Sequence, residues 1–505
     1  MKKQSTLILL ATAAMASCNA GAGPIDQKGA NVFPSSAMED SISITMGDVM
    51  PFYDDGVMNI YHLRNVTGTN SLFYHPIARL ATSDFIHYEN CGIALNYEES
   101  VSSIDAALGT GSFIKDDEGV YHCFYTGHND KAHDEELSGA GLIHKEALRH
   151  ATSKDNQKTW QKDEDFLIFG YEDDFRDPYV YRDSKDHRYY MLVTTRDYAN
   201  PLGPSVIRRF GADSLNASAE EWEFVDNFFT NDAGDYNMEC PSYIELGGYQ
   251  YLAYSEQGDN RVTHYRYRTS SEEQWKAFPR DAIDASGFYA GRLEKAGDKL
   301  FAFAWCARLT GGNTGSFDWA GNLVSHELRQ DASTGELFPV MPYTYKDYFN
   351  HVTDLGQEEG NFLFDGSKFE ARAIGKLGHN VTRLSMKVKA DGNVGDFGLT
   401  FGLDGKLDNR LGDGTLTFDL SGNKLSCHNN VSNILRYGPE LTSVSYAFET
   451  GKTYDVDLII DGEIYSVYLN NEIALTARLI NMVDNHISFY SNQAKVSITE
   501  VKAYE

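Results

Sequence analysis

The sequence is short of positive charge. Its 505 residues include 44 Lys and Arg against 73 Asp and Glu, which gives a formal net charge of −29 at pH 7. A protein that binds nucleic acid through its phosphates needs a basic surface, and so does one that binds an anionic membrane or a polyanionic substrate. The charge balance argues against all three classes of function.

Cysteine and clustered histidine are also scarce. The chain has 6 Cys and no CxxC pair, so we expect no disulfide framework. Its 15 His show no HExxH or other metal-ligand spacing, and we therefore predict no metal bound through His or Cys and no cofactor. The Cys residues that remain after Cys18 have no close partners in sequence: Cys91, Cys123, Cys240, Cys306 and Cys427.

Long apolar runs are missing beyond the first residues. A basic start is followed by an apolar run over residues 7–15, which is typical of a secretory signal and too short to span a bilayer. The tetrapeptide MASC (15–18) resembles a bacterial lipobox, so we predict a lipoprotein signal over 1–18, lipidation of Cys18 and a polar tether over 19–40. An ordinary signal peptide is the alternative. The expected location is the bacterial cell envelope, at the outer-membrane surface or in the periplasm, with only the lipid in the membrane.

Aromatic residues are abundant, at 13%, and they recur in a pattern. Five segments place a turn rich in Asp and Gly before an alternating aromatic strand, as in VMNIYHL (57–63) and RYYMLVTT (188–195), and each is followed by a second hairpin. About four antiparallel strands per segment predict a five-bladed β-propeller over 41–350. A double-sheet sandwich is the alternative for this region.

The pattern changes after residue 350. Alternating segments such as TYDVDLII (453–460) and IYSVYLN (464–470) are separated by short turns rich in Asp, Asn and Gly. They predict a separate C-terminal antiparallel β-sandwich over 351–505, and hence an all-β protein.

Three acidic residues share one position in the repeat. Asp48, Asp177 and Glu239 each lie near the start of the first strand of a predicted blade, so all three should meet at the same mouth of the central channel. Cleavage of a glycosidic bond needs one protonated and one ionised carboxyl group, and a cluster of like charges raises a pKa in the way the acid requires. The alternative is that they are ordinary surface acids. Their matched register favours a catalytic group.

These segments resemble glycoside hydrolase family 32, the invertases, inulinases and levanases. FRDP (175–178) and MECP (238–241) are similar to the family's RDP and EC motifs, SDFIHYE (83–89) to its TDLVHWE segment, and GFYA (287–290) to its FYA stretch. The resemblance runs from about residue 44 to 505. It implies a propeller followed by a sandwich, and an oligo- or polysaccharide substrate, most simply a fructan.

The resemblance also implies roles for individual residues. Asp48 would attack the anomeric carbon, Glu239 would act as general acid and base, and Asp177 would stabilise the transition state, in a retaining double displacement. Arg176 would orient Asp177 or bind the sugar. The other candidate substrate contacts are Ser112, in the GTGSFIK segment (109–115), and three aromatic residues for which core packing is the alternative: Tyr289, Trp305 and Trp319.

One segment departs from the family. Where the family has WMNDPNG, this chain has TMGDVMP (45–51), so Asp48 keeps the nucleophile's place but the Trp and both Asn are absent. Three hypotheses stay open. The first is a β-fructofuranosidase acting on inulin, levan or fructo-oligosaccharides. The second is an arabinofuranosidase or xylosidase similar to family 43, and the third is a non-catalytic glycan-binding lipoprotein.

Overall fold

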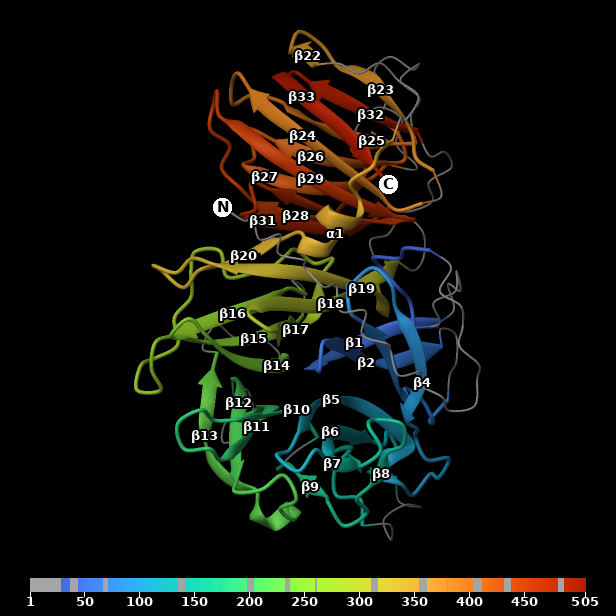
Figure 1. Cartoon of the computed structure of the whole chain (residues 1–505), viewed down its shortest axis with the longest axis vertical. Helices are drawn as coiled ribbons and strands as arrows, with labels where there is room; N and C mark the ends of the chain where they lie inside the picture. The colour runs from blue at the N-terminus through green and yellow to red at the C-terminus, as the bar shows by residue number, and fades with distance from the viewer. Residues whose placement is uncertain are drawn as a thin grey trace, which may run out of the picture.

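The computed structural model is built almost entirely of β-strands (Figure 1). The only α-helix within the described ranges is α1 (Tyr343–Tyr348), which joins the two halves of the chain. The all-β prediction is confirmed. The predicted signal and Cys18 lie outside the described residues, which are 29–36, 44–66, 71–134, 141–171, 173–197, 204–231, 237–258, 261–309, 317–353, 361–378, 380–402, 411–430, 437–479 and 486–505.

The first half consists of antiparallel strands that pair with their neighbours in sequence. Hydrogen bonds between β19 and β1 join the last group of strands to the first, with Met46 opposite Gly321. The groups, in chain order, are β1 (Ile44–Asp54), β2 (Val57–Val66), β3 (Ile77–Thr82) and β4 (Glu89–Leu95); β5 (Ala107–Lys115), β6 (Tyr121–His128), β7 (Glu146–Ser153), β8 (Gln161–Lys162) and β9 (Ile168–Phe169); β10 (Phe175–Arg182), β11 (Tyr189–Arg196), β12 (Ser205–Ala212) and β13 (Glu223–Thr230); β14 (Asn237–Leu246), β15 (Tyr249–Gln257) and β16 (Thr263–Arg268); and β17 (Tyr289–Ala296), β18 (Lys299–Leu309), β19 (Phe317–Gln330) and β20 (Leu337–Val340).

The first strand of each group faces the first strands of other groups. Strand β1 contacts β5 and β17, β10 contacts β5 and β14, and β14 contacts β17. Each of these five strands therefore has two of the others as neighbours, and Figure 1 shows their groups arranged around them. Residues at matching positions on the five strands are brought towards one another.

The second half forms two antiparallel sheets with one shared core, the arrangement of a β-sandwich. Strand β24 shows how the sequence builds this core. Its residues TRLSMKVKA alternate strictly between buried and half-buried, which puts Leu384, Met386 and Val388 on the inner face of the sheet. The strands are β21 (Val352–Thr353), β22 (Phe362–Asp365), β24 (Thr382–Ala390), β29 (Thr453–Asp461), β30 (Ile464–Leu469), β31 (Ile473–Arg478) and β33 (Lys495–Tyr504) in one sheet, and β23 (Glu370–Lys376), β25 (Asp396–Phe401), β26 (Gly414–Asp419), β27 (Lys424–Asn429), β28 (Glu440–Ser445) and β32 (His486–Asn492) in the other.

Buried polar contacts tie the two halves together. The imidazole of His326 lies between the carboxylate of Asp284, at 2.9 Å, and the hydroxyl of Tyr468, also at 2.9 Å. Asp284 also accepts a hydrogen bond from the backbone N–H of Thr476 at 3.0 Å. Because buried polar groups are costly to leave unpaired, these bonds fix the sandwich against the first half in one orientation.

Part of the stretch expected to be a tether packs onto this body. Val32 is fully buried, and its backbone N–H donates to the carboxylate of Asp461 at 3.0 Å. The side chain of Asn322 donates to the carbonyl of Phe33 at 2.8 Å. Within the described ranges, no helix has the length and apolar character needed to cross a membrane.

Candidate active site

Four of the first strands are bulged at the same depth. Their pairing with the next strand slips between Gly47 and Met50, Arg176 and Tyr179, Glu239 and Ser242, and Tyr289 and Arg292. In each slip one non-glycine residue has a positive φ: Asp48 (33°), Asp177 (60°), Cys240 (55°) and Ala290 (55°). A β-bulge turns a side chain away from the regular alternation of a strand, and bulges are frequent next to active sites.

The bulges explain the local sequence around the acids. Asp48 and Asp177 are themselves the left-handed residues, a conformation that Asp tolerates better than most residues do. Pro178 and Pro241 fall inside the slips, where a residue without an N–H forfeits no ladder hydrogen bond. Glu239 precedes the left-handed Cys240 just as Tyr289 precedes Ala290. Asp48 and Asp177 thus share one position in the bulge, and Glu239 lies one position before it.

Asp48 is held by one strand of the last group and one of the second group. The indole N–H of Trp305, on β18, donates to Asp48 Oδ1 at 3.1 Å, and the Thr110 hydroxyl, on β5, donates to the Asp48 carbonyl at 3.3 Å. The ring of Trp319 packs closely against the backbone at Gly47, where a Cβ would lie 2.3 Å from the ring and only glycine leaves room. One carboxylate oxygen is therefore fixed by Trp305.

Asp177 is fixed through the backbone. It is 4% exposed, and its Oδ2 accepts a hydrogen bond from the N–H of Cys240 at 2.8 Å. Its own N–H donates to the Thr126 hydroxyl at 3.0 Å. The bulge that turns Glu239 therefore also supplies the donor that orients Asp177.

Glu239 lies between a cation and a phenol. Arg176 Nη2 donates to Glu239 Oε1 at 3.0 Å, and the Tyr289 hydroxyl donates to Oε2 at 2.5 Å. A guanidinium group has no acceptor atom, so a proton on Glu239 must sit on Oε2, where the Tyr289 hydroxyl can turn to accept it. The geometry thus names the oxygen that would carry a catalytic proton.

Arg176 forms ion pairs with more than one carboxylate. Besides Glu239 it donates to Asp174 at 2.7 Å and to Glu146 at 3.2 Å, and its side chain is 14% exposed. Since three acids share one guanidinium, the charge of Glu239 is only partly compensated. Asp174 and Glu146 were not expected from the sequence, because neither lies on a matching strand position.

The carboxyl groups influence one another electrostatically. Burial, followed by the charges of Asp177 and Glu239, raises the pKa of Asp48 to about 7, against the lowering effect of the Trp305 N–H. Burial raises the pKa of Asp177 to about 6; Glu239 also raises it, while Arg176 lowers it. Asp48 and Asp177 therefore keep their protons to a higher pH than ordinary aspartates do.

Arg292 is a second cation that sequence reasoning missed. It is 1% exposed, and none of its side-chain nitrogens has a hydrogen-bond partner within the described residues. Its charge lowers the pKa of both Asp48 and Asp177. It lies on β17 three positions after Tyr289, at the far side of the same bulge, a position that nothing in the predicted strand pattern marked as special.

The predicted aromatic contacts fall into two groups. Trp305 is 1% exposed and meets Tyr289 and Trp319 edge-on, so its main contact with the site is the bond to Asp48. Trp319 is half-buried, and His75 stacks on it with ring centroids 4.3 Å apart. The predicted contact Ser112 is not joined to the three acids by any of these hydrogen bonds. It is buried, and its hydroxyl accepts a hydrogen bond from the Val180 N–H at 2.9 Å.

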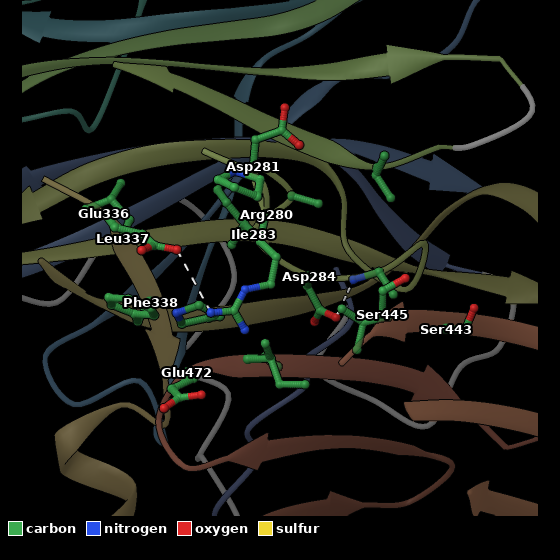
Figure 2. A pocket seen from close by; sticks show the side chains of 18 residues that line it. Arg280, Asp281, Ile283, Asp284, Glu336, Leu337, Phe338, Ser443, Ser445 and Glu472 are labelled. Atoms are coloured by element: carbon green, nitrogen blue, oxygen red, sulfur yellow. Dashed lines mark hydrogen bonds and ion pairs between the residues drawn. The ribbon is translucent and has the colours of Figure 1, made fainter. Parts of the chain in front are cut away.

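A separate pocket lies where the two halves meet (Figure 2). It is lined by residues 279–285 and 336–339 of the first half and by 443–445 and 472–474 of the sandwich. Two of its carboxylates are already engaged, Asp281 by Arg266 and His264, and Asp284 by His326. None of the predicted catalytic acids lines it, so we place the candidate active site at the bulges.

Comparisons with known proteins find one family over much of the chain. Residues 50–332, more than half of the chain, match the Glycosyl hydrolases family 32 N-terminal domain. The matched residues include Asp177 and Glu239 and begin just after Asp48. A sucrose-6-phosphate hydrolase of Escherichia coli is 33% identical over 199 residues, which cover 37% of this chain and 36% of the relative. The chain thus matches about a third of the length of that curated relative.

Solved structures show that the fold is shared over nearly the whole chain. A family 32 β-fructofuranosidase of Bombyx mori has a TM-score of 0.65 at 16% identity and covers 92% of this chain and 93% of its own. An exo-inulinase from Aspergillus awamori has a TM-score of 0.66 at 14% identity, with 91% and 95% covered. A sucrose-6-phosphate hydrolase from Lactobacillus gasseri has a TM-score of 0.67 at 17% identity, with 91% and 90% covered.

Proposed function

The chain belongs to glycoside hydrolase family 32, and from this premise we propose that it hydrolyses β-fructofuranosidic bonds. The single observation that carries the proposal is the cluster of Asp48, Asp177 and Glu239 on aligned bulges, with separate partners for each carboxyl group. The proposed substrates are inulin, levan or fructo-oligosaccharides. The names of the similar proteins support fructosides, since those proteins are hydrolases of sucrose phosphate, fructosides and inulin.

In the first step the sugar is transferred to the enzyme. The Asp48 oxygen that Trp305 does not hold attacks the anomeric carbon, while Glu239 passes its Oε2 proton to the leaving oxygen, so that the glycosidic bond breaks as the ester bond forms. Asp177, fixed by the Cys240 N–H, hydrogen-bonds sugar hydroxyls and stabilises the oxocarbenium-like charge.

In the second step water removes the sugar. Glu239, now ionised and still held by Arg176, takes a proton from a water molecule that attacks the anomeric carbon and releases Asp48. Two displacements at one carbon retain its configuration, which is general for this family. The pKa of Asp48, raised mainly by burial, falls when its neighbours hold protons, so a protonated Glu239 favours an ionised Asp48.

We also propose that the five groups of strands in the first half are the five blades of a propeller. The support is the pattern of contacts among β1, β5, β10, β14 and β17, together with the fold shared with family 32 enzymes. The three acids then lie at one mouth of the central channel, on the first, third and fourth blades. An experimental structure with another number of blades would refute this arrangement.

The proposed activity is tested by product analysis. The purified chain without its signal is incubated with sucrose, inulin, levan and pentose-based glycans, and the products are separated by chromatography. Release of fructose or fructo-oligosaccharides is expected, with none from the Glu239→Ala variant over the same time. Release of arabinose or xylose instead would move the activity to that of family 43, and glycan binding without any release would favour the binding protein.

We further propose that the mature protein is anchored in the cell envelope through a lipid on Cys18, from the MASC tetrapeptide (15–18). The Cys18→Ser variant should move from the membrane fraction to the soluble fraction when the bacterium is fractionated. Cys91→Ser, which leaves the tetrapeptide intact, should stay with the membrane. An unmodified Cys18 in the membrane-bound wild type, found by mass spectrometry, would contradict the proposal.

A further inference from the structure

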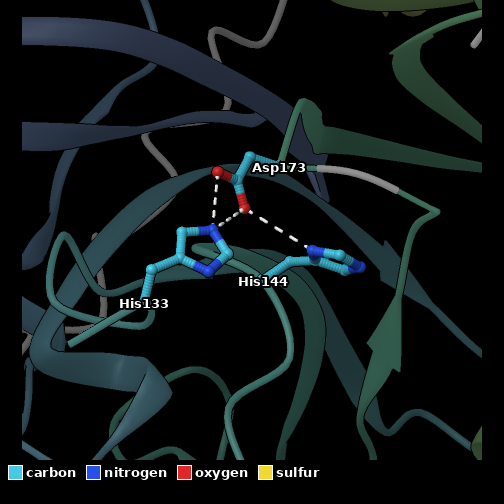
Figure 3. A group of neighbouring side chains, drawn as sticks. All are labelled: His133, His144 and Asp173. Carbon is cyan, nitrogen blue, oxygen red and sulfur yellow. Dashed lines mark hydrogen bonds and ion pairs between the residues drawn. The ribbon is translucent and has the colours of Figure 1, made fainter. Parts of the chain in front are cut away.

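Two imidazoles and a carboxylate meet near the candidate active site (Figure 3). His133 follows β6, His144 precedes β7, and Asp173 precedes β10. His133 Nε2 lies 3.0 Å from both carboxylate oxygens of Asp173, and His144 Nδ1 lies 3.6 Å from Oδ1. Figure 3 shows both rings turned towards the carboxylate, the two histidines from the connection between β6 and β7 and Asp173 from the segment before β10. The histidine spacing in the sequence did not indicate this group, because only the fold brings Asp173 to the connection that carries both histidines.

The distances suit a shared cation. One ligand atom from each of the three side chains lies within 4.8 Å of the others. Ligand atoms bound to one Zn²⁺ at about 2.0–2.2 Å are at most ~4.4 Å apart, so closure around the ion needs only a small side-chain movement. A carboxylate between two imidazoles is also a typical donor set for a divalent transition metal, whereas Ca²⁺ and Mg²⁺ prefer oxygen ligands alone.

The surroundings orient the three ligands and leave access from solvent. The backbone N–H of Lys145 donates to Asp173 Oδ1 at 2.9 Å, and the ring of Phe169 meets that of His144 edge-on. Such contacts in the second layer around a metal hold its ligands in place. The side chains of His133, His144 and Asp173 are 54%, 18% and 41% exposed, so an ion can enter and keep open positions for water.

We infer that His133, His144 and Asp173 form a binding site for a divalent transition-metal ion of the zinc type. A bound ion would link the connection between β6 and β7 to the start of β10, the strand that carries Arg176 and Asp177. The ion would thereby hold this segment in place beside the active site. Asp174, the residue after the proposed ligand Asp173, accepts the hydrogen bond that positions Arg176. The strongly negative net charge of the chain favours a cation at this position.

The test uses zinc alone on the untagged, full-length mature chain after treatment with a chelator. Isothermal titration should give one Zn²⁺ per chain, and zinc should raise the melting temperature, while Ca²⁺ should not. His133→Ala and His144→Ala should each lose the bound zinc and the rise in melting temperature. His87→Ala is the matched control. His87 also pairs with one carboxylate, that of Asp84 at 2.7 Å, but within the described residues this pair belongs to no group of three possible metal ligands.

Cobalt(II) provides a second measurement that does not depend on stability. Its visible absorption reports nitrogen and oxygen ligands directly, and the spectrum of the wild type should change in His144→Ala and in Asp173→Asn but not in His87→Ala. Circular dichroism of each variant checks that it is folded. Zinc binding of equal stoichiometry in the wild type and both His variants, or no binding by the folded wild type at micromolar zinc, would overturn the inference.

Discussion

The Asp48→Asn variant should lose its activity and yet be more stable than the wild type at pH 8. Removal of the nucleophile leaves no group to form the ester, so kcat should fall by about 10³-fold or more. The stability gain comes from burial and from the neighbouring carboxylates, which raise the pKa of Asp48 from 3.8 to about 7 in the folded protein. Asn has the same shape and no charge to bury.

The sign of the pH dependence follows from this shift. Between about pH 4 and pH 7 the folded state holds the Asp48 proton and the unfolded state has released it, so wild-type stability falls as pH rises through this range. Below pH 4 both states are protonated and the two proteins should be alike. The full pKa change corresponds to roughly 4 kcal/mol of unfolding free energy, an upper value because Asp177 and Glu239 share the protons.

Urea unfolding at pH 4 and pH 8 measures the effect. The difference in unfolding free energy between Asp48→Asn and the wild type should be small at pH 4 and favour the variant at pH 8. Asp213→Asn is the control, because the side chain of Asp213 is 86% exposed and its replacement should leave this difference near zero at both pH values. A variant less stable than the wild type at pH 8 would contradict the raised pKa.

The sequence was sufficient to predict the strands and the meeting of the acids. A strand with period-2 alternation and a turn next to it are local features. The similar offsets of Asp48, Asp177 and Glu239 from their turns, about six to eight residues, predicted a similar depth without knowledge of long-range contacts. The family resemblance rested on these same segments, and the match over residues 50–332 confirms it.

The partners of those acids could not be predicted in the same way. Trp305 was a candidate sugar contact, with core packing as the alternative. Its bond to Asp48 was not predicted, because it joins residues 257 positions apart and depends on where β18 lies beside β1. Arg292 carries no motif, and its charge acts on the acids from a buried position beside them, which a single sequence does not reveal. Ser112 lies in a motif-like segment, yet its hydroxyl is directed to the Val180 N–H of the next group of strands. Electrostatic roles of this kind depend on three-dimensional neighbours.

The Glu239→Ala variant should lose activity in a way that depends on the leaving group. With sucrose or inulin the leaving oxygen needs a proton, and loss of the general acid should lower kcat by about 10²- to 10⁴-fold. With an aryl β-fructofuranoside the phenolate leaves without protonation, so the first step should be nearly unaffected and the ester on Asp48 should accumulate. Rapid-mixing kinetics should then show a burst of phenol followed by slow turnover, because no base activates water.

Azide distinguishes the two proposed roles of Glu239 from a merely structural one. Azide is a strong nucleophile that needs no base, so it should restore aryl fructoside turnover in Glu239→Ala but not in Asp48→Asn, which cannot form the ester. Tyr289→Phe is the matched control: it removes the hydroxyl that contacts Glu239 Oε2 but keeps the carboxyl group, so azide should have little effect on it. Because the azide attacks an ester already formed with inversion, the fructosyl azide should have the β configuration of the substrate. An α-configured product would mean a single displacement and would assign Asp48 to a role other than nucleophile.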